Sequence, residues 1–322
     1  MGRWNVGRAA LLAVSGWCLL PLQGSAQTSA LRPSEPQLLQ PGVVSIGGIT
    51  SYRPAFAPDG SAVYFTVEIG EDYAIAFSTL RRRTWSLPQL MPFSGSHSDA
   101  EPFLSPDGSR LFFTSQRPLR AGEPARSDYD IWYVDRLAAG RWGSPRHLGA
   151  PVNSAARELY PAVSRDGTLY FSRSDGTGSD LWRAVRRGEG YAEPERLPEP
   201  VNSASREAGV YVHPDQRFII FDSNRPGSAG GTDLYVSFRL ETGWSEPRNL
   251  GPSVNSRANE TSAMVSADGN SLYFASNRRT AQPRIGRDLP LAELIAQARR
   301  PGNGLFHVYQ VAADTVINPP AE

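Results

Sequence analysis

The sequence predicts an all-β protein, a five-bladed β-propeller made of four-stranded antiparallel blades. The first observation is an internal repeat of roughly 50 residues, whose parts recur in the same order from positions 140, 190 and 243. The second is the composition, because 27 Pro, 30 Gly and 12 Tyr favour turn-rich strands over helices. The third is a strand that the last repeat lacks and that the other end of the chain supplies.

Residues 1–26 have the features of an export signal. Arg3 and Arg8 precede an apolar run at 9–22, and the small residues 24–26 fit a cleavage site. The run is short for a membrane span, and an uncleaved membrane anchor is the alternative. We therefore expect an exported protein without a membrane span in its mature chain.

The charged and sulfur-containing residues exclude several kinds of chemistry. The single cysteine, Cys18, lies in the export segment, so the remaining chain has no disulfide, thiol nucleophile or Cys-ligated metal. Removal of Arg3 and Arg8 leaves 31 basic residues against 32 acidic ones, a net charge of −1. This balance does not support nucleic-acid binding. The basic residues are all arginine, which excludes a lysine base or Schiff base.

Each repeat is built around a turn with a central aspartate. Pro or another residue precedes the aspartate, the aspartate bonds its own backbone, and Gly after it accepts a positive φ. Gln216 takes the place of this Gly in one repeat, at an expected cost of about 1–2 kcal/mol if the geometry is kept. The five turn aspartates are Asp59, Asp107, Asp166, Asp215 and Asp268.

Four short strands per repeat are typical of a propeller blade. One strand precedes the turn, a second follows it, a third begins with Asp in three repeats and with His307 in the last, and a fourth carries an aromatic residue and Pro. The fifth repeat lacks its fourth strand, but residues 34–45 match residues 245–256. The N-terminal strand should therefore close the ring and leave no open edge. We expect one domain over 27–322, with blades at about 51–93, 98–148, 157–198, 206–250 and 259–311 plus 34–45.

An insertion between Asn277 and Leu305 breaks the last repeat. Asp288 can cap a helix over 289–299, and Pro301-Gly302 can end it. We expect this helix to lie on a propeller face through its apolar stripe, with a lid as the alternative.

Three segments carry a family resemblance: Glu158 to Phe171 with Pro161 and Asp166-Gly167, Phe221-Asp222-Ser223-Asn224-Arg225-Pro226-Gly227, and Gly231-Thr232-Asp233-Leu234-Tyr235. They resemble the TolB-type, WD-like (PD40-type) β-propeller repeats of exported bacterial proteins, over about residues 34–311. The resemblance implies a periplasmic or secreted protein of the bacterial envelope. It does not imply an activity. TolB itself has a separate α/β domain and six blades, so the Tol-system role is not implied.

Four of the five repeats carry a carboxylate eight positions before the turn aspartate. We expect each carboxylate to bond backbone N–H groups or an arginine such as Arg117, Arg225 or Arg278, and so to serve blade closure. The alternative is a metal or sugar site at the channel mouth. The five positions hold Ser51, Asp99, Glu158, Glu207 and Glu260.

Residues that differ between repeats are the better candidates for ligand binding. Two positions after the carboxylate, on the same strand face, the side chain varies in charge and size, as a ligand pocket requires. Solvated positions without a constraint are the alternative. The apolar residues three positions before the turn aspartate should pack between blades; they are Phe56, Leu104, Val163, Val212 and Val265. The ligand-binding candidates are Arg53, Glu101, Tyr160, Tyr211, His97 and His307, whereas the same variable position holds Gly209 and Ser262 in the last two blades.

These features predict a binding or scaffold module for an envelope protein, a peptide or a glycan at the channel face. We expect a monomer without cofactor or metal, and we favour binding without catalysis because the repeat uses the chain completely and leaves no appended catalytic domain. The sequence has no phosphate loop and no nucleophile elbow, which weighs against nucleotide binding and a serine hydrolase. The alternative is a carbohydrate-active enzyme, a glycosidase or lyase, which needs two carboxyl groups about 5–9.5 Å apart. Its candidates are Asp99, Glu101, Glu158 and Glu207.

Overall fold

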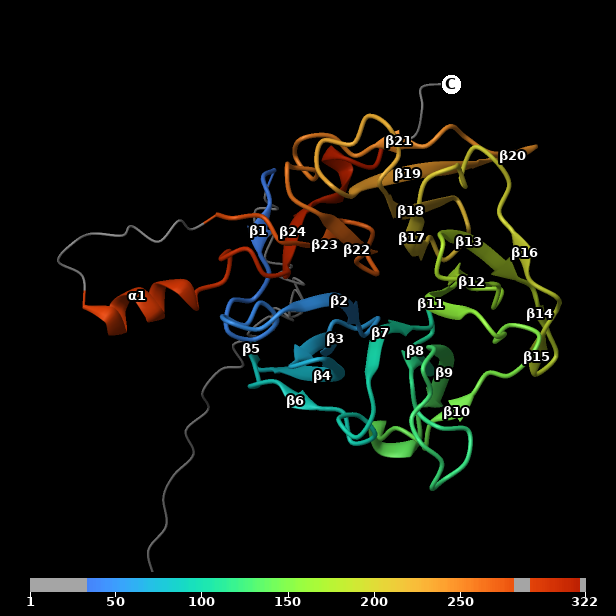
Figure 1. Cartoon of the computed structure of the whole chain (residues 1–322), viewed down its shortest axis with the longest axis horizontal. Coiled ribbons are helices and arrows are strands. Elements are labelled where there is room, and N and C mark those ends of the chain that lie inside the picture. Colours follow the sequence, from blue (N-terminus) through green and yellow to red (C-terminus); the bar gives the residue numbers. More distant parts are fainter. Residues whose placement is uncertain (1–33, 281–289, 319–322) are drawn as a thin grey trace, which may run out of the picture. The chain divides into compact units, whose positions relative to one another are not determined.

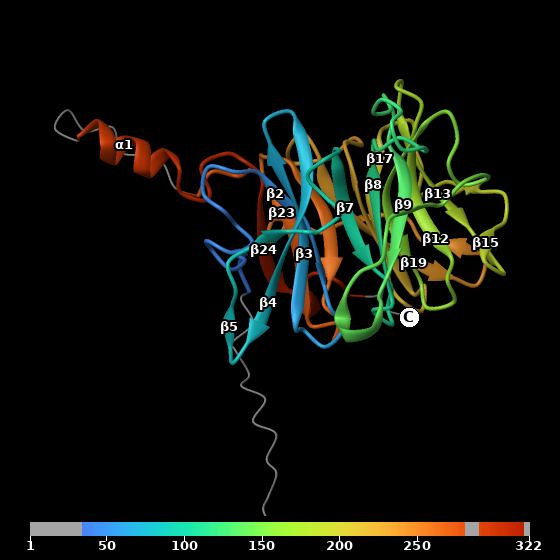
Figure 2. The ribbon, with the colours of Figure 1, turned by 90° about the horizontal axis from the view of Figure 1, so that it is seen from below.

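The computed structural model describes residues 34–280 and 290–318, and the expected export segment lies outside the described residues. Within these ranges, five antiparallel sheets surround a common centre, and β14 and β15 add a small hairpin (Figure 1). The five-bladed propeller is therefore confirmed. Figure 2, turned by 90°, shows the strands running between the two faces of the ring. No helix among the described residues is long and apolar enough to cross a membrane.

In blades 1 to 4 the strands follow the chain from the centre of the ring to its edge, whereas in blade 5 the N-terminal β1 forms the outer strand. Blade 1 contains β2 (Ser51–Phe56), β3 (Ala62–Ile69), β4 (Asp72–Arg81), β5 (Thr84–Trp85) and β6 (Gln89–Leu90). Blade 2 contains β7 (Asp99–Leu104), β8 (Arg110–Ser115), β9 (Asp130–Asp135) and β10 (Arg146–His147). Blade 3 contains β11 (Arg157–Val163), β12 (Leu169–Ser174), β13 (Ser179–Ala184) and β16 (Glu195–Arg196), with the hairpin β14 (Arg186–Arg187) and β15 (Gly190–Tyr191). Blade 4 contains β17 (Glu207–Val212), β18 (Phe218–Ser223), β19 (Asp233–Leu240), β20 (Gly243–Trp244) and β21 (Arg248–Asn249). Blade 5 contains β22 (Glu260–Val265), β23 (Ser271–Ser276), β24 (His307–Ala312) and β1 (Gln37–Leu38).

The core lies between neighbouring blades, which bury both faces of their central strands. All six residues of β7 are buried, for example, and so are all six of β23. The second strand of each blade places a phenylalanine at the same position, and full burial of such a side chain contributes about 1.5–3 kcal/mol. These fully buried rings are Phe65, Phe113, Phe171, Phe221 and Phe274.

The N-terminal strand closes the ring, as the sequence predicts. β1 pairs with β24 in antiparallel register, with Leu38 opposite Tyr309. The Leu39 N–H donates to the Val308 carbonyl at 2.8 Å, and the Ser45 hydroxyl donates to the same carbonyl at 2.9 Å. Leu39 and Val44 are buried in the seam. The two ends of the propeller chain are thus joined by backbone pairing and by apolar packing.

The aspartate turns also have the expected geometry. In blade 1 the Asp59 carboxylate accepts from the Ser61 N–H at 3.0 Å and the Ser61 hydroxyl at 2.6 Å, and Gly60 has φ of 69°. Gln216 keeps the left-handed conformation, with φ of 54°, although it is not glycine. Its amide accepts from the Tyr170 hydroxyl at 2.7 Å and donates to Asp166 at 2.8 Å. These two hydrogen bonds offset the backbone strain.

The helix of the insertion, α1 (Leu291–Ala298), lies within the predicted range. Pro290 occupies the N-cap position, whereas the expected cap Asp288 lies outside the described residues. No residue of α1 is buried, so the expectation that its apolar stripe packs on a propeller face is wrong. Its C-terminal end contacts the loop before blade 1, where a Cβ on Gly47 would come within 2.0 Å of the Arg299 carbonyl oxygen.

A buried carboxylate holds the beginning of the innermost strand in four blades. Glu207 accepts from the Ser203 N–H at 3.0 Å, the Ser223 hydroxyl at 2.8 Å and Arg225 at 3.1 Å. The Arg225 guanidinium lies 5.1 Å from the Phe221 ring centroid and donates to the Val201 carbonyl at 2.7 Å. We call this arrangement the carboxylate clamp; its four pairs are Asp99–Arg117, Glu158–Arg173, Glu207–Arg225 and Glu260–Arg278.

Removal of one partner from a buried clamp should strongly destabilise the fold. Glu207→Ala leaves the Arg225 charge without its carboxylate, and we expect the free energy of unfolding to fall by about 3–5 kcal/mol. The control is Glu195→Ala, which removes a surface pair with Arg183 at 3.0 Å and should cost less than about 1 kcal/mol. Urea denaturation measures both values. Equal losses in the two variants would contradict a stabilising role of the clamp.

Candidate functional site

Each innermost strand contains a β-bulge, and the bulge determines what lies in the central channel. The register of pairing with the second strand shifts in all five blades at the same place. One residue per bulge adopts a left-handed conformation with φ between 55° and 61°. These residues are Arg53, Glu101, Tyr160, Gly209 and Ser262, the variable set of the sequence analysis. Four of the five are not glycine, so the strain is retained in each of those blades.

Arg53 crosses the channel from blade 1. Its Nη2 donates to the carbonyls of Pro161 at 2.9 Å and Val210 at 3.0 Å, which belong to blades 3 and 4. The side chain is fully buried, and its guanidinium lies 5.4 Å from the Tyr160 ring centroid. Burial lowers the pKa of Arg53, while the neighbouring Glu101 carboxylate opposes that shift. Its Nε and Nη1 have no hydrogen-bond partner among the described residues.

Glu101 lies beside Arg53 in the channel and is 5% exposed. Its carboxylate accepts from the Tyr160 N–H at 2.6 Å and the Thr114 hydroxyl at 3.2 Å. Burial raises the pKa of Glu101 to about 7, against the opposing effects of the Tyr160 N–H and the Arg53 charge. Unlike the clamp carboxylates, it has no arginine within ion-pair distance among the described residues. Glu101 can therefore exchange a proton near neutral pH.

The opposite side of the channel is filled by Asp222. This buried carboxylate accepts from Arg206 at 2.9 Å and from the Thr261 hydroxyl at 2.7 Å. Gly209 is required beside it, because a Cβ there would lie 1.7 Å from an Asp222 carboxylate oxygen. Together with Arg53 and Glu101, these groups fill the centre of the ring with polar side chains.

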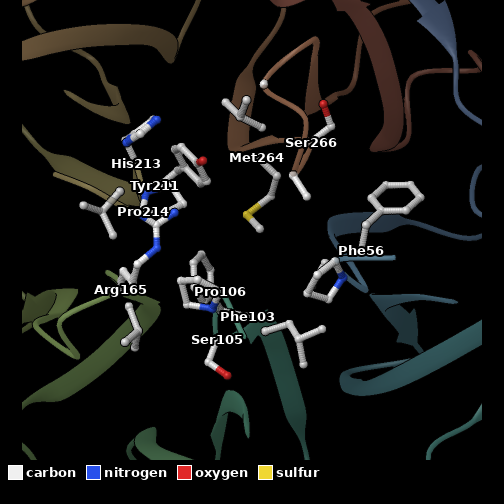
Figure 3. Close-up of a pocket in the computed structure, with 18 of the residues that line it drawn as sticks. Phe56, Phe103, Ser105, Pro106, Arg165, Tyr211, His213, Pro214, Met264 and Ser266 are labelled. Atoms are coloured by element: carbon white, nitrogen blue, oxygen red, sulfur yellow. The ribbon is translucent and has the colours of Figure 1, made fainter. Parts of the chain in front are cut away.

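A pocket of about 340 Å³ opens at the end of the channel where the innermost strands run into the aspartate turns (Figure 3). All five blades contribute to its walls. Pro54, which directly follows Arg53, is part of the lining of this pocket. The lining from blades 1, 2 and 5 includes Phe56, Pro58, Phe103, Pro106, Met264 and Tyr273, and that from blades 3 and 4 includes Val163, Arg165, Tyr211, His213, Pro214 and Arg217.

The pocket is chemically divided. Phe56 and Tyr273 stack with ring centroids 4.6 Å apart, and with Phe103 and Met264 they make one wall apolar. Figure 3 shows Arg165 and His213 on the side opposite Phe56. A wall that carries Arg165 and Arg217 faces a wall of carbon and sulfur atoms. Such a pocket suits a ligand with unlike ends.

His213 is neutral over the physiological pH range. Its Nδ1 accepts from the Asp215 N–H at 3.0 Å, and its Nε2 lies 2.8 Å from Arg217 Nη2. Burial lowers the pKa of His213 to about 4, with further lowering by the positive charges of Arg217 and Arg165. Arg165 donates to the Asp215 carboxylate and to the Pro214 carbonyl through its backbone N–H, the latter at 2.7 Å.

The structure divides the sequence-derived candidates into separate places. Arg53, Glu101 and Tyr160 meet in the channel centre, and Tyr211 lines the pocket. His97 is half-buried in the loop before β7, and His307 is buried in β24 with its Nε2 3.3 Å from Asn303. Neither of these two histidines lines the pocket. Asp99, Glu158 and Glu207 form clamps.

The pocket was not predicted from the sequence. The apolar set of Phe56, Leu104, Val163, Val212 and Val265 was expected only to pack between blades, yet all five also line the cavity. Arg165 and Arg217 were not candidates. The available signal was the residues that flank the turn aspartate: Arg165 stands where other turns have Pro or Ala, and His213 replaces Ser. Among the described residues, no group of three His, Cys, Asp or Glu side chains could hold a metal ion.

Comparisons with known proteins indicate the fold of this chain but not its activity. No family model matches the chain, and no curated protein matches it. Similar solved structures include TolB from Acinetobacter baumannii, with a TM-score of 0.48, 15% identity and coverage of 81% of this chain and 54% of that one. A protein described as TolB from Agrobacterium tumefaciens has a TM-score of 0.47, 15% identity and coverage of 81% and 90%. The expected resemblance to TolB-type propellers is thus confirmed.

Enzymes share the same fold. An α-L-arabinofuranosidase from Lactobacillus brevis has a TM-score of 0.50 and 14% identity, with coverage of 85% of this chain and 92% of that one. At such identities the likeness concerns the fold alone. The comparisons therefore allow both a binding propeller and a glycosidase.

Glu101 should give the stability of the protein a pH dependence that a glutamine removes. A glutamate with its folded pKa raised from 4.5 to about 7 binds more protons in the folded state than in the unfolded one. Its contribution therefore lowers stability as pH rises from about 4.5 to 7, on the order of 3 kcal/mol in total.

The measurement is the difference in unfolding free energy between wild type and Glu101→Gln at several pH values. We expect this difference to shift in favour of the glutamine variant across that window. Glu158 also has a raised pKa, but its contribution is common to both proteins and cancels. A difference that stays constant from pH 4.5 to 7 would show that the pKa of Glu101 is not raised.

Proposed function

We propose that this chain is an exported binding module whose ligand, a segment of a protein, a peptide or a glycan, enters the pocket at the turn end of the channel. The observation that carries the proposal is the pocket of about 340 Å³ with walls from all five blades. Ligand sites of proteins are typically concave, mostly apolar and equipped with a few polar groups. Arg53, Glu101 and Tyr160, the first ligand-binding candidates, would then close the pocket from within.

Binding is favoured over catalysis by the state of the acidic groups. Three of the four proposed catalytic carboxylates, Asp99, Glu158 and Glu207, are paired with arginines in clamps. In the pocket, Asp215 is paired with Arg165, and Asp268 accepts from the Ser266 hydroxyl at 2.5 Å. A glycosidase needs one carboxyl group that donates a proton and a second that attacks or activates water. Carboxylates held by an arginine or a turn are poorly suited to these roles.

The cellular setting is part of the proposal. The predicted export signal at 1–26 and the resemblance to TolB-type repeats support a periplasmic or secreted location. A monomer is proposed because the N-terminal strand pairs with β24 and covers the edge of the last blade.

Blocking the pocket should abolish binding without unfolding the protein. Ala267 lines the pocket and is exposed, so Ala267→Trp would fill the cavity with an indole. The control is Ala204→Trp. Ala204 is an exposed alanine in the loop before β17, at the end of β17 that is away from the pocket. On an array of peptides and glycans, we expect the pocket variant to lose at least about tenfold in affinity for every ligand that wild type binds. Binding that survives Ala267→Trp and is lost in the control would move the site to the opposite face.

A carbohydrate-active enzyme remains the second candidate, supported by Glu101, whose pKa is raised to about 7 by burial. A general acid needs such a pKa. We expect the wild-type protein to release no sugar from a panel of plant and bacterial polysaccharides. Release at an enzyme-like rate, abolished by Glu101→Gln but not by Glu195→Gln, would establish the enzyme instead.

A further inference from the structure

Arg165, His213 and Arg217 form one wall of the pocket, which we call the cationic wall. Two hydrogen-bond donors face each other there. The Asp215 N–H donates to Nδ1 of His213, so this nitrogen is the acceptor of the neutral ring and Nε2 carries the proton. Nε2 lies 2.8 Å from Nη2 of Arg217, which can only donate. The contact therefore brings together two N–H groups without an acceptor. An oxygen atom with negative charge placed beside both would satisfy them.

Arg217 has no acidic partner. Its side chain is exposed, and among the described residues no carboxylate lies within ion-pair distance of it. The carboxylate of Asp215 is taken by Arg165, and that of Asp268 accepts from Ser266 and Asn270 in its own turn. The positive charge of Arg217 is thus available to a ligand.

The two serine hydroxyl groups of the pocket lining already donate to carboxylates of the turns. Ser105 donates to the Asp107 carboxylate at 2.6 Å, and Ser266 donates to Asp268 at 2.5 Å. A neutral sugar would need many such groups to replace the water around its hydroxyls. The remaining surface of the opposite wall is apolar, with Phe56, Phe103 and Met264. The pocket thus suits an apolar body with one anionic end better than a neutral glycan.

We propose that the pocket binds a terminal carboxylate carried by an apolar group, with the carboxylate at His213 and Arg217 and the apolar group against the Phe103 and Met264 wall. The inference rests on the proposed function and specifies its ligand. A cavity of about 340 Å³ is at the small end of ligand pockets, which span about 300–1,000 Å³, so it suits the end of a chain. The C-terminus of a peptide ending in an apolar residue and a small free acid share this chemistry.

The test compares a peptide that ends in Leu-Phe with a free carboxylate and the same peptide as its amide, by calorimetry or fluorescence anisotropy. We expect the amide to bind wild type at least about tenfold more weakly than the acid. Arg217→Gln should weaken the acid to the level of the amide and leave the amide unchanged. Arg141→Gln, at an exposed arginine that is not part of the pocket lining, serves as the charge-matched control and should change neither. A higher salt concentration should weaken the binding of the acid but not that of the amide.

The outcomes separate the two proposals. Equal binding of acid and amide, or an equal loss of both in Arg217→Gln, overturns the carboxylate inference. If Ala267→Trp abolishes that equal binding, the pocket proposal still stands. If no acid binds at all, the inference fails, and the array decides the proposed function by itself. Finally, 3-phenylpropionate and N-acetylphenylalanine distinguish a small free acid from a peptide C-terminus as the ligand. If these compounds bind as tightly as the peptide, the ligand is a free acid. If they bind much more weakly, the ligand is a peptide C-terminus.

Discussion

The carboxylate clamps hold blades 2 to 5 each to the blade before it. In the loop between blades 3 and 4, Asn202 accepts from the Leu181 N–H at 2.8 Å and donates to the Leu181 carbonyl at 2.9 Å, so the loop stays against blade 3. The next residue, Ser203, donates to Glu207 at the start of blade 4. A buried charge is costly unless it is fully bonded, and at Glu207 the arginine, hydroxyl and backbone donors meet this requirement. The angle between blades is thereby set by hydrogen bonds with defined directions.

This constraint explains where a ligand can enter. The five innermost strands surround the centre of the ring, and the bulges turn a side chain into it from every blade except blade 4, where the bulge residue is Gly209. Arg53 reaches the carbonyls of two blades across the ring, so the centre is closed by side chains of one molecule. Beyond the bulges the strands end in the aspartate turns, and there the pocket opens between the blades. The innermost strands thus close the centre of the ring at their bulges and leave a pocket at their turn end.

The sequence predicted most of what the repeats share, but it missed the bulge of the innermost strands and the features that single blades have alone. The aspartate turns, the clamps with Arg117, Arg225 and Arg278, and closure by β1 recur or match between repeats, so a comparison within the chain finds them. The bulge was not predicted: it shifts the alternation of faces by one residue, but an innermost strand of six or seven residues with both faces largely buried shows no clear alternation in which that shift could be read. The pocket was missed since its polar residues flank the turns, where the side chain has no fixed role in the blade. The exposure of α1 could not be predicted, because a helical stripe does not tell what covers it.

The turns of blades 3 and 4, which carry the cationic wall, are linked by contacts that the repeat pattern does not predict. Arg165 bonds Asp215 and Pro214, and Gln216 bonds Asp166, so the turns of blades 3 and 4 share three contacts. Glycine follows the turn aspartate in the other four blades, and φ of 54° at Gln216 costs about 1–2 kcal/mol of strain. Only a residue with a side chain can form the bond to Asp166. Under the proposed function, these contacts between the two turns hold Arg165, His213 and Arg217 in place before a ligand binds, which would reduce the entropy lost on binding.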